Sequence, residues 1–323
     1  MTKNPIGYPD AAVEVAGLRH LYGSREALAG ISFSVSRGEI FGVLGPNGGG
    51  KTTLFKILST LLTPSAGTAR VFGHDLGNEP DAVRRHLGVV FQRPSLDPKL
   101  TVMENLRHHG HLYGVRGPTF RERARELLDR MALTDRARDR VETLSGGLQR
   151  RTELAKALIH RPDLLLLDEA STGLDPGARR DFTDYLGRLR DGDGVTVLLT
   201  THILDEAERC DRVGILHRGR LVALGTPAQL KARLGGDVVV VQAVNPPELQ
   251  GKVRERFGCE PLLVDGLLRV ERSRGHEFVR ELVEAFPGEV QSVTFGRPTL
   301  EDVFVSLTGQ RLRGEGVNGG RTG

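Results

Sequence analysis

The chain has 323 residues, of which 38% are hydrophobic and 27% are charged, so it can form one large α/β domain and a second, smaller one. Its formal net charge is +4, and 45 basic residues are interleaved with 41 acidic ones, which argues against nucleic acid as a partner. Its longest apolar runs, such as 164–167, are far shorter than the ~20 residues needed to cross a bilayer, so a separate protein would have to supply any membrane span.

The sequence also bears on the compartment. Residues 1–12 contain two prolines and no apolar stretch, so we expect no signal peptide. Cys210 and Cys259 have neither CxxC spacing nor a partner motif, which is typical of a reducing compartment. We therefore expect a soluble, intracellular protein.

From residue 13 to about residue 235, strand-like runs alternate with helical stretches, which predicts an α/β domain. The segment from about 100 to 160 is dense in Leu, Arg and Glu, and it predicts a helical subdomain inserted between two halves of a sheet. The expected strands are 13–15, 31–35, 40–43, 89–91, 164–167 and 195–200.

The chain changes character after Gly235 and Gly236, and the next segments predict the order strand, helix, strand, strand, helix, strand. We expect a small split-βαβ, α+β domain over 237–309, and a disordered tail over 310–323. The expected segments are 237–243, 247–257, 262–264, 267–270, a helix with Phe278, Leu282, Val283 and Phe286 on one face, and 290–295.

A last helix is expected to start with Thr299 as its N-cap, because an acid, Asp302, follows three residues on. Its expected apolar stripe consists of Leu300, Val303, Phe304 and Leu307.

A glycine-rich loop lies between an apolar strand that ends at Leu44 and a helical stretch, as a phosphate-binding loop requires. Its glycines let backbone N–H groups turn towards phosphates, and we expect Lys51 on the β- and γ-phosphates and the Thr52 hydroxyl on Mg²⁺. A plain glycine-rich turn is the weaker interpretation, because the bare pattern arises by chance in roughly one per cent of chains this long. The residues expected to bind nucleotide here are Gly45, Pro46, Asn47, Gly48, Gly49, Gly50, Lys51, Thr52 and Thr53.

Asp168 and Glu169 end the leucine run 164–167, which is expected to be a buried strand. The carboxyl edge of a parallel sheet is where ligands of open α/β folds bind. An isolated Asp-Glu pair would more often mark a solvated turn, but the phosphate-binding loop favours a ligand site.

The segment 144–149 predicts a second anion-binding helix start far from the first. Ser145 stands at the expected N-cap, and Gly146 and Gly147 leave backbone N–H groups uncovered. A plain capped helix is the alternative interpretation. We call the phosphate-binding loop and this helix start the two cradles. One chain does not need both cradles for one γ-phosphate, so the second cradle is expected to serve another molecule.

Five segments therefore follow one another in a fixed order that resembles the nucleotide-binding subunit of ATP-binding-cassette (ABC) transporters. The amino-acid sequences of segments 145–151 and 298–304 are similar to the corresponding segments of daunorubicin-resistance-type exporter ATPases. The resemblance implies a P-loop NTPase domain with a helical subdomain, and ATP and Mg²⁺ as cofactors. The segments are 45–52, Gln92, 144–149, 164–169 and 200–202.

The resemblance also implies roles for individual residues. Asp168 would hold Mg²⁺ through water, and Glu169 would polarise the attacking water. Gln92 would contact both Mg²⁺ and that water, and His202 would contact the γ-phosphate. A single Gln or His does not by itself predict such a role, so these two assignments rest on the order of the five segments and on the strands that precede them.

Tyr22 matches the aromatic residue that stacks on adenine in the family, with a core tyrosine as the alternative. Residues 172–175 look like the family's D-loop, so Asp175, together with Ser145, Gly146 and Gly147, is expected to complete the ATP site of a second copy. Departures from the family's pattern remove no polar catalytic group; they are Ala170 in place of Pro, Gly49 in place of Ala or Ser, and Leu148 in place of Met.

The resemblance implies the ATPase subunit of an exporter, working as a homodimer with a separate integral membrane permease at the inner face of the cell membrane. The alternative is a soluble ABC ATPase that acts as a clamp in DNA repair or translation. The single cassette and the lack of sustained heptads favour the exporter. Drug, lipid and polysaccharide all remain open as substrates, and the C-terminal domain could form a further dimer contact or a regulatory site.

Overall fold

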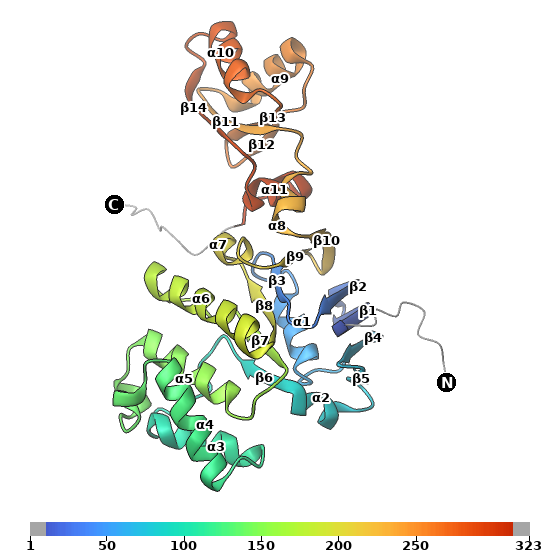
Figure 1. Cartoon of the computed structure of the whole chain (residues 1–323). Helices are drawn as coiled ribbons and strands as arrows, with labels where there is room; N and C mark the ends of the chain where they lie inside the picture. The colour runs from blue at the N-terminus through green and yellow to red at the C-terminus, as the bar shows by residue number, and fades with distance from the viewer. Residues whose placement is uncertain (1–10, 313–323) are drawn as a thin grey trace.

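The computed structural model describes residues 11–312 (Figure 1). The centre of the first domain is a sheet whose strands are β3 (Ile40–Leu44), β6 (Leu87–Val90), β7 (Leu164–Asp168), β8 (Thr196–Thr201), β9 (Arg212–His217) and β10 (Arg220–Gly225). The order across the sheet is β10-β9-β3-β8-β7-β6. All neighbours pair in parallel except β10, which runs antiparallel to β9.

The leucine run of β7 explains why this strand lies inside the sheet. Successive side chains of a strand point to opposite faces, so a strand buried on both faces reads as continuously apolar. Leu164 and Leu166 belong to the core on one face, and Leu165 and Leu167 belong to the core on the other. The expected buried strand is confirmed.

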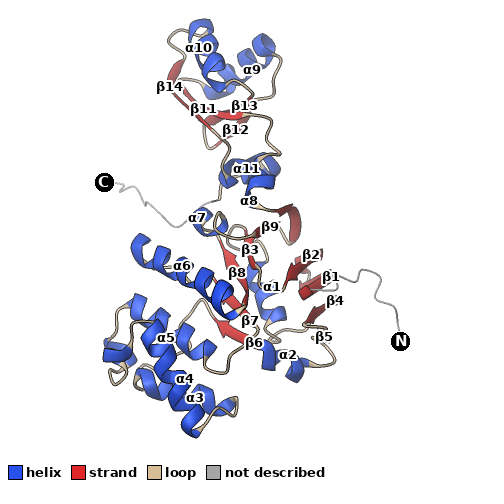
Figure 2. Cartoon of the chain, in the orientation of Figure 1, coloured by secondary structure: helices blue, strands red, loops and turns tan. Residues whose placement is uncertain are grey.

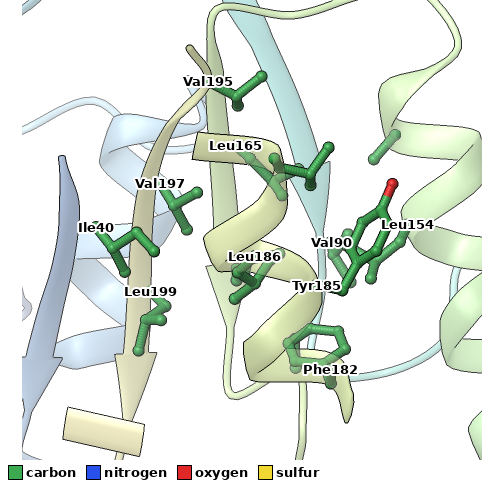
Figure 3. Packing of buried hydrophobic residues seen from close by; sticks show 14 of the residues in the cluster. Ile40, Val90, Leu154, Leu165, Phe182, Tyr185, Leu186, Val195, Val197 and Leu199 are labelled. Carbon is green, nitrogen blue, oxygen red and sulfur yellow. The ribbon is translucent and has the colours of Figure 1, made fainter. Parts of the chain in front are cut away.

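Helix α6 (Pro176–Asp193) covers one face of this sheet (Figures 1 and 3). Phe182 and Leu186 of α6 share one core with Leu165 of β7 and Val197 of β8, as Figure 3 shows. The other face packs against helix α1 and a second sheet.

The second sheet is antiparallel and has the order β2-β1-β4-β5. Leu54 and Phe55 of α1 are buried in the core that joins this sheet to the central one. The start of α1 is therefore held between two sheets. The elements are β1 (Ala11–Tyr22), β2 (Arg25–Ser36), α1 (Lys51–Leu58), β4 (Ala66–Val71) and β5 (His74–Asp75).

The helical subdomain predicted over about 100–160 appears as a group of helices on the side of β6 (Figure 2). Figure 1 shows it in green, apart from the second sheet. Its helices are α3 (Val102–Leu112), α4 (Gly117–Arg130) and α5 (Gly146–Leu158), and the remaining short helices of the first domain are α2 (Pro80–His86), α7 (Leu204–Ala207) and α8 (Pro227–Lys231).

The small C-terminal unit has the predicted order of elements. Its sheet is antiparallel throughout, with the order β12-β13-β11-β14, and two helices cover one face. The predicted order of an α/β domain followed by a small α+β unit is confirmed. The elements are β11 (Asp237–Ala243), α9 (Pro246–Phe257), β12 (Leu262–Val264), β13 (Leu267–Arg272), α10 (Gly275–Ala285) and β14 (Val290–Gly296).

Helix α11 (Leu300–Thr308) returns to the first domain. Thr299 caps it and Asp302 closes the capping box, as predicted. Leu300, Val303 and Phe304 belong to the core that also contains α6 and the central sheet.

The prediction placed this last helix in a domain over 237–309, and the structure buries the apolar face of α11 against the first domain. Polar contacts join α11 to the small sheet, where Arg269 pairs with Asp302 and Ser306 donates to Glu271 at 3.2 Å. The helix lies between the two units (Figure 1).

Other sequence predictions also need correction. Val283 and Leu307 are 47% and 43% exposed, so they do not belong to the buried stripes of their helices. The sequence reasoning missed β4, β9, β10 and α2. Of the predicted tail 310–323, residues 313–323 lie outside the described residues, and Leu312 is buried.

Within residues 11–312, no helix combines the length and the apolar character that a membrane span requires.

The packing of α11 can be tested with Phe304→Ala, because Phe304 is fully buried. Losing such a side chain costs about 3–5 kcal/mol, so we expect a lower midpoint of urea unfolding and faster hydrogen exchange in α11. Leu307→Ala, in the same helix, is the control and should change the free energy of unfolding by less than about 0.5 kcal/mol. Equal effects of the two changes would contradict this packing.

Candidate functional site

A cleft of about 320 Å³ lies where the loop after β3 meets the antiparallel sheet and the ends of β6 and β7. It brings together seven of the fourteen residues predicted to bind nucleotide, and with them Gln92 and Glu169. The residues that line it are Tyr22, Arg25, Ala27, Asn47, Gly48, Gly50, Lys51, Thr52, Thr53, Gln92 and Glu169.

The glycines of the loop are required by close approach and by backbone conformation. A Cβ at Gly45 would lie 2.2 Å from the backbone oxygen of Leu216, which cannot move aside easily. Gly50 has φ +110° and a Cβ there would lie 2.7 Å from the Ala27 oxygen. The next residue starts α1, so the unpaired N–H groups of its first turn face the cleft.

Lys51 is the buried cation of this cleft, with 3% of its side chain exposed. Its Nζ donates to the backbone oxygens of Gly45 at 2.7 Å and Pro46 at 3.0 Å. It also lies 3.0 Å from Oε1 of Glu169. Thr52, on the exposed side of the first turn of α1, lines the cleft beside it.

Glu169 stands at the centre of the polar contacts. Its Oε2 accepts from Nε2 of Gln92 at 3.4 Å and lies 3.2 Å from Nδ1 of His202, although without the alignment of a hydrogen bond. Burial acts to raise the pKa of Glu169, but His202 and Lys51 outweigh it and lower that pKa to about 2. The carboxylate is therefore ionised at neutral pH.

The backbone at Glu169 is in the left-handed region, with φ +46°. Such a conformation costs a non-glycine residue roughly 1–3 kcal/mol and persists where the surroundings fix it. Here the N–H of Glu169 is held by the backbone oxygen and the hydroxyl of Thr200 at 3.1 and 3.2 Å. The carboxylate of this residue contacts Lys51.

Asp168 lies just behind the cleft and is 4% exposed. Burial raises its pKa and the neighbouring Glu169 adds to this, while a hydrogen bond from the Thr200 hydroxyl, at 2.6 Å, acts in the opposite direction. A carboxylate in this environment favours a nearby cation. Asp168, the Thr52 hydroxyl and Gln92 carry oxygen atoms of the kind that Mg²⁺ prefers, so these are the residues that could hold the ion.

Tyr22 is 46% exposed on the rim of the cleft, so the core-tyrosine alternative is wrong. Its ring meets the ring of His20 edge to face, with the centroids 4.6 Å apart. A flat aromatic surface is thus available beside the phosphate loop.

The second predicted cradle lies elsewhere in the described structure. Ser145 caps α5 by accepting from the N–H of Leu148 at 3.4 Å, and it and Gly146 are exposed. Asp175 caps α6 by accepting from the N–H of Ala178 at 2.9 Å. Neither these residues nor Gly147 lines the cleft that holds Lys51.

The sequence reasoning missed Arg25 and Ala27 in the cleft, and it gave Thr200 no role. Arg25 pairs in register with Tyr22 across the hairpin of β1 and β2. The short turn that follows Tyr22 could have indicated this neighbour. The contact of Thr200 with Asp168 depends on strand pairing, which the sequence did not show.

The family model described as ABC transporter matches residues 28–172. The chain is 41% identical over 312 residues to the daunorubicin/doxorubicin resistance ATP-binding protein DrrA of Streptomyces peucetius, and the match covers 93% of each chain. It is 36% identical over 311 residues to the linearmycin resistance ATP-binding protein LnrL of Bacillus subtilis, covering 93% of this chain and 99% of that one. The Nod factor export ATP-binding protein I of Rhizobium sp. (strain N33) is 38% identical over 312 residues, covering 93% and 98%.

Solved structures agree with the fold. An ATP-binding subunit of an ABC transporter has a TM-score of 0.63 and 32% identity, covering 69% of this chain and 93% of that one. A dimeric ATP-binding cassette, MJ0796, in a post-hydrolysis state with ADP and Pi has a TM-score of 0.61 and 28% identity, covering 66% and 98%.

The resemblance inferred from the motifs is thus confirmed by relatives that match along nearly the whole chain. With its phosphate loop, Lys51 and Glu169 in one cleft, the chain belongs to the ABC transporter family, as an ATP-binding subunit that hydrolyses ATP.

Proposed function

We propose that this chain is the ATPase subunit of an exporter, and that two copies close around two ATP molecules to drive a separate integral membrane permease. The observation that carries the proposal is the separation of the two cradles. Lys51 and Glu169 line one cleft, whereas the Ser145 helix start is exposed outside it. One chain therefore holds half of each site.

The binding step follows from the contacts of Lys51. Its Nζ is held by two backbone oxygens and by Glu169, and the β- and γ-phosphates would replace the carboxylate as its anionic partner. The N–H groups at the start of α1 add a positive field, and the ring of Tyr22 offers a surface for adenine. Mg²⁺, held by Thr52, Asp168 and Gln92, would neutralise charge on the phosphates.

The hydrolytic step follows from the contacts of Glu169. Once Lys51 turns to the phosphates, Glu169 loses its strongest cation and can accept a hydrogen bond from water. Gln92 and His202 already lie within 3.4 Å of its carboxylate, so they would orient that water towards the γ-phosphate.

Ser145 and Gly147 of the second copy would complete the site. The Ser145 hydroxyl and the N–H groups at the start of α5 are donors that can meet developing charge on the γ-phosphate. Asp175, at the start of α6, would cross the interface beside them. The dimeric state of a related cassette bound to ADP and Pi supports this arrangement.

The exporter assignment is supported by relatives named for daunorubicin and linearmycin resistance and for Nod factor export. We place the subunit in the cytoplasm, on the inner face of the cell membrane. A drug-like or other hydrophobic solute is the substrate class we favour. These relatives favour an exporter over a soluble clamp in DNA repair or translation.

Mixing two inactive variants tests whether the cradles combine between copies. Lys51→Ala destroys the cradle of its own chain, and Ser145→Ala should slow the partner's site on the order of a hundredfold. A mixed dimer then contains one intact site, so an equal mixture should recover up to about a quarter of wild-type ATPase activity.

The control mixes Lys51→Ala with the double variant Lys51→Ala/Ser145→Ala, which leaves every possible site damaged. Recovery in the first mixture and not in the second supports action between copies. If the first mixture stays as inactive as its components, Ser145 does not act on the partner.

Glu169→Gln should bind ATP, hydrolyse it far more slowly and accumulate as a closed dimer. The change removes the negative charge that faces Lys51 and His202 but keeps the shape of the side chain. Sedimentation with and without ATP measures the dimer, and ADP serves as the control nucleotide. Near-normal turnover by this variant would exclude Glu169 as the residue that activates water.

A further inference from the structure

A second cavity, of about 400 Å³, lies between the small sheet and helix α11. It is larger than the nucleotide cleft of about 320 Å³, and the two share no lining residue. Three parts of the chain form its walls: Leu234 at the end of the first domain, the small sheet with the loop after α9, and α11. A molecule bound there would contact all three.

Side-chain alternation along β13 explains why the cavity has a polar wall. Leu268 and Val270 belong to the core that α9 and α10 cover, so Arg269 and Glu271 point to the opposite face of the sheet. Helix α11 packs on that face through polar contacts with both of these residues. Arg269 and Glu271 therefore form the polar wall between the sheet and α11.

This polar wall is incompletely paired. The side chain of Arg269 is 9% exposed and donates to Asp302 through Nη1, but its Nε has no acceptor among residues 11–312. Glu271 accepts from the Ser306 hydroxyl at 3.2 Å and forms no ion pair within the described part of the chain. Buried donors are normally satisfied, and a carboxylate is stabilised by a nearby cation. The wall therefore suits a ligand that has both a cation and an acceptor.

The charges around the cavity set the sign of that ligand. Arg269 is balanced by Asp302, and Glu260, which is exposed, pairs with Arg254 at 2.9 Å. Glu271 is left as the uncompensated charge of the lining. An ammonium group is thus attracted to the cavity, and an anion is repelled.

Apolar side chains complete the lining. They include Val238 of β11, Leu262 of β12 and Val305 of α11. A cavity of this size, with apolar walls and a few polar groups, is typical of a site for a small molecule. The apolar part of the lining would bury the hydrocarbon body of a ligand whose polar groups meet Arg269 and Glu271.

We propose that this cavity binds an amphipathic amino alcohol. Its ammonium group pairs with Glu271, its hydroxyl accepts from the guanidinium of Arg269, and its apolar body packs against Val238 and Val305. Such a ligand would hold the small unit, α11 and the end of the first domain together. Its binding does not depend on the proposed ATP chemistry.

Cys259 reports on occupancy, because it lines the cavity and is partly exposed, whereas Cys210 is buried. The full chain is treated with methyl methanethiosulfonate, and modification of Cys259 is followed by mass spectrometry. 2-Amino-1-hexanol should slow this modification at least about threefold at saturation, because a ligand in such a cavity covers most of its lining. 1,2-Hexanediol and 2-hydroxyhexanoate keep the hydrocarbon body and a hydroxyl but lack the ammonium group, so they should protect less, the anion least. Unmodified Cys210 in the same samples shows that the chain stays folded.

Glu271→Gln keeps the shape of the side chain and removes its charge. It should raise the half-protecting concentration of the amino alcohol about two- to fivefold, as loss of an exposed ion pair does, and leave that of the diol unchanged. Glu255→Gln is the matched control, since Glu255 is an exposed residue of α9 outside the cavity, and it should behave as the wild type.

Protection by the amino alcohol that weakens in Glu271→Gln and not in Glu255→Gln supports the inference. Absence of protection in the folded wild-type chain overturns it. Equal protection by 2-hydroxyhexanoate, or an equal loss in the two variants, also overturns it, because the charge of Glu271 would then not select the ligand.

Discussion

The buried pair of Lys51 and Glu169 is the interaction on which the site depends. It joins the loop after β3 to the end of β7, and both side chains are almost fully withdrawn from water. Such a pair is tolerated only with further hydrogen bonds, which Gly45 and Pro46 supply to the lysine. The pair therefore holds an ammonium group at the point where phosphate is needed, and a stronger anion can take the place of the carboxylate.

The strand order explains how distant parts of the chain meet around this pair. β3, β8, β7 and β6 are consecutive neighbours in the sheet, and each ends at the same edge. Lys51, His202, Glu169 and Gln92 follow these strands in that order, so the sheet itself sets the row of polar groups. The exposed starts of α5 and α6 lie outside the row, and this separation is the reason for our proposal that a second copy completes the site.

Much of the site could be predicted from the sequence, because two of its parts have local signatures. One is the glycine-rich loop between a strand and a helix, and the other is the leucine run that ends in two carboxylates. The order of strands has none, so the bond between Thr200 and Asp168 was not foreseen. β10 was missed because it is only partly buried and lacks a clean apolar pattern. Phe304 was predicted to lie on the apolar stripe of its helix, but the residues that it packs against lie in the first domain. Arg150 resembles a surface charge until Phe91, 59 residues away, is placed beside it.

The central claim is that one copy of the chain holds half of each ATP site. The most direct measurement is ATPase activity per chain as a function of protein concentration, with sedimentation on the same samples in the presence of ATP. Activity per chain should rise with concentration and level off as dimer forms. Constant activity per chain at concentrations where only monomer sediments would contradict the claim.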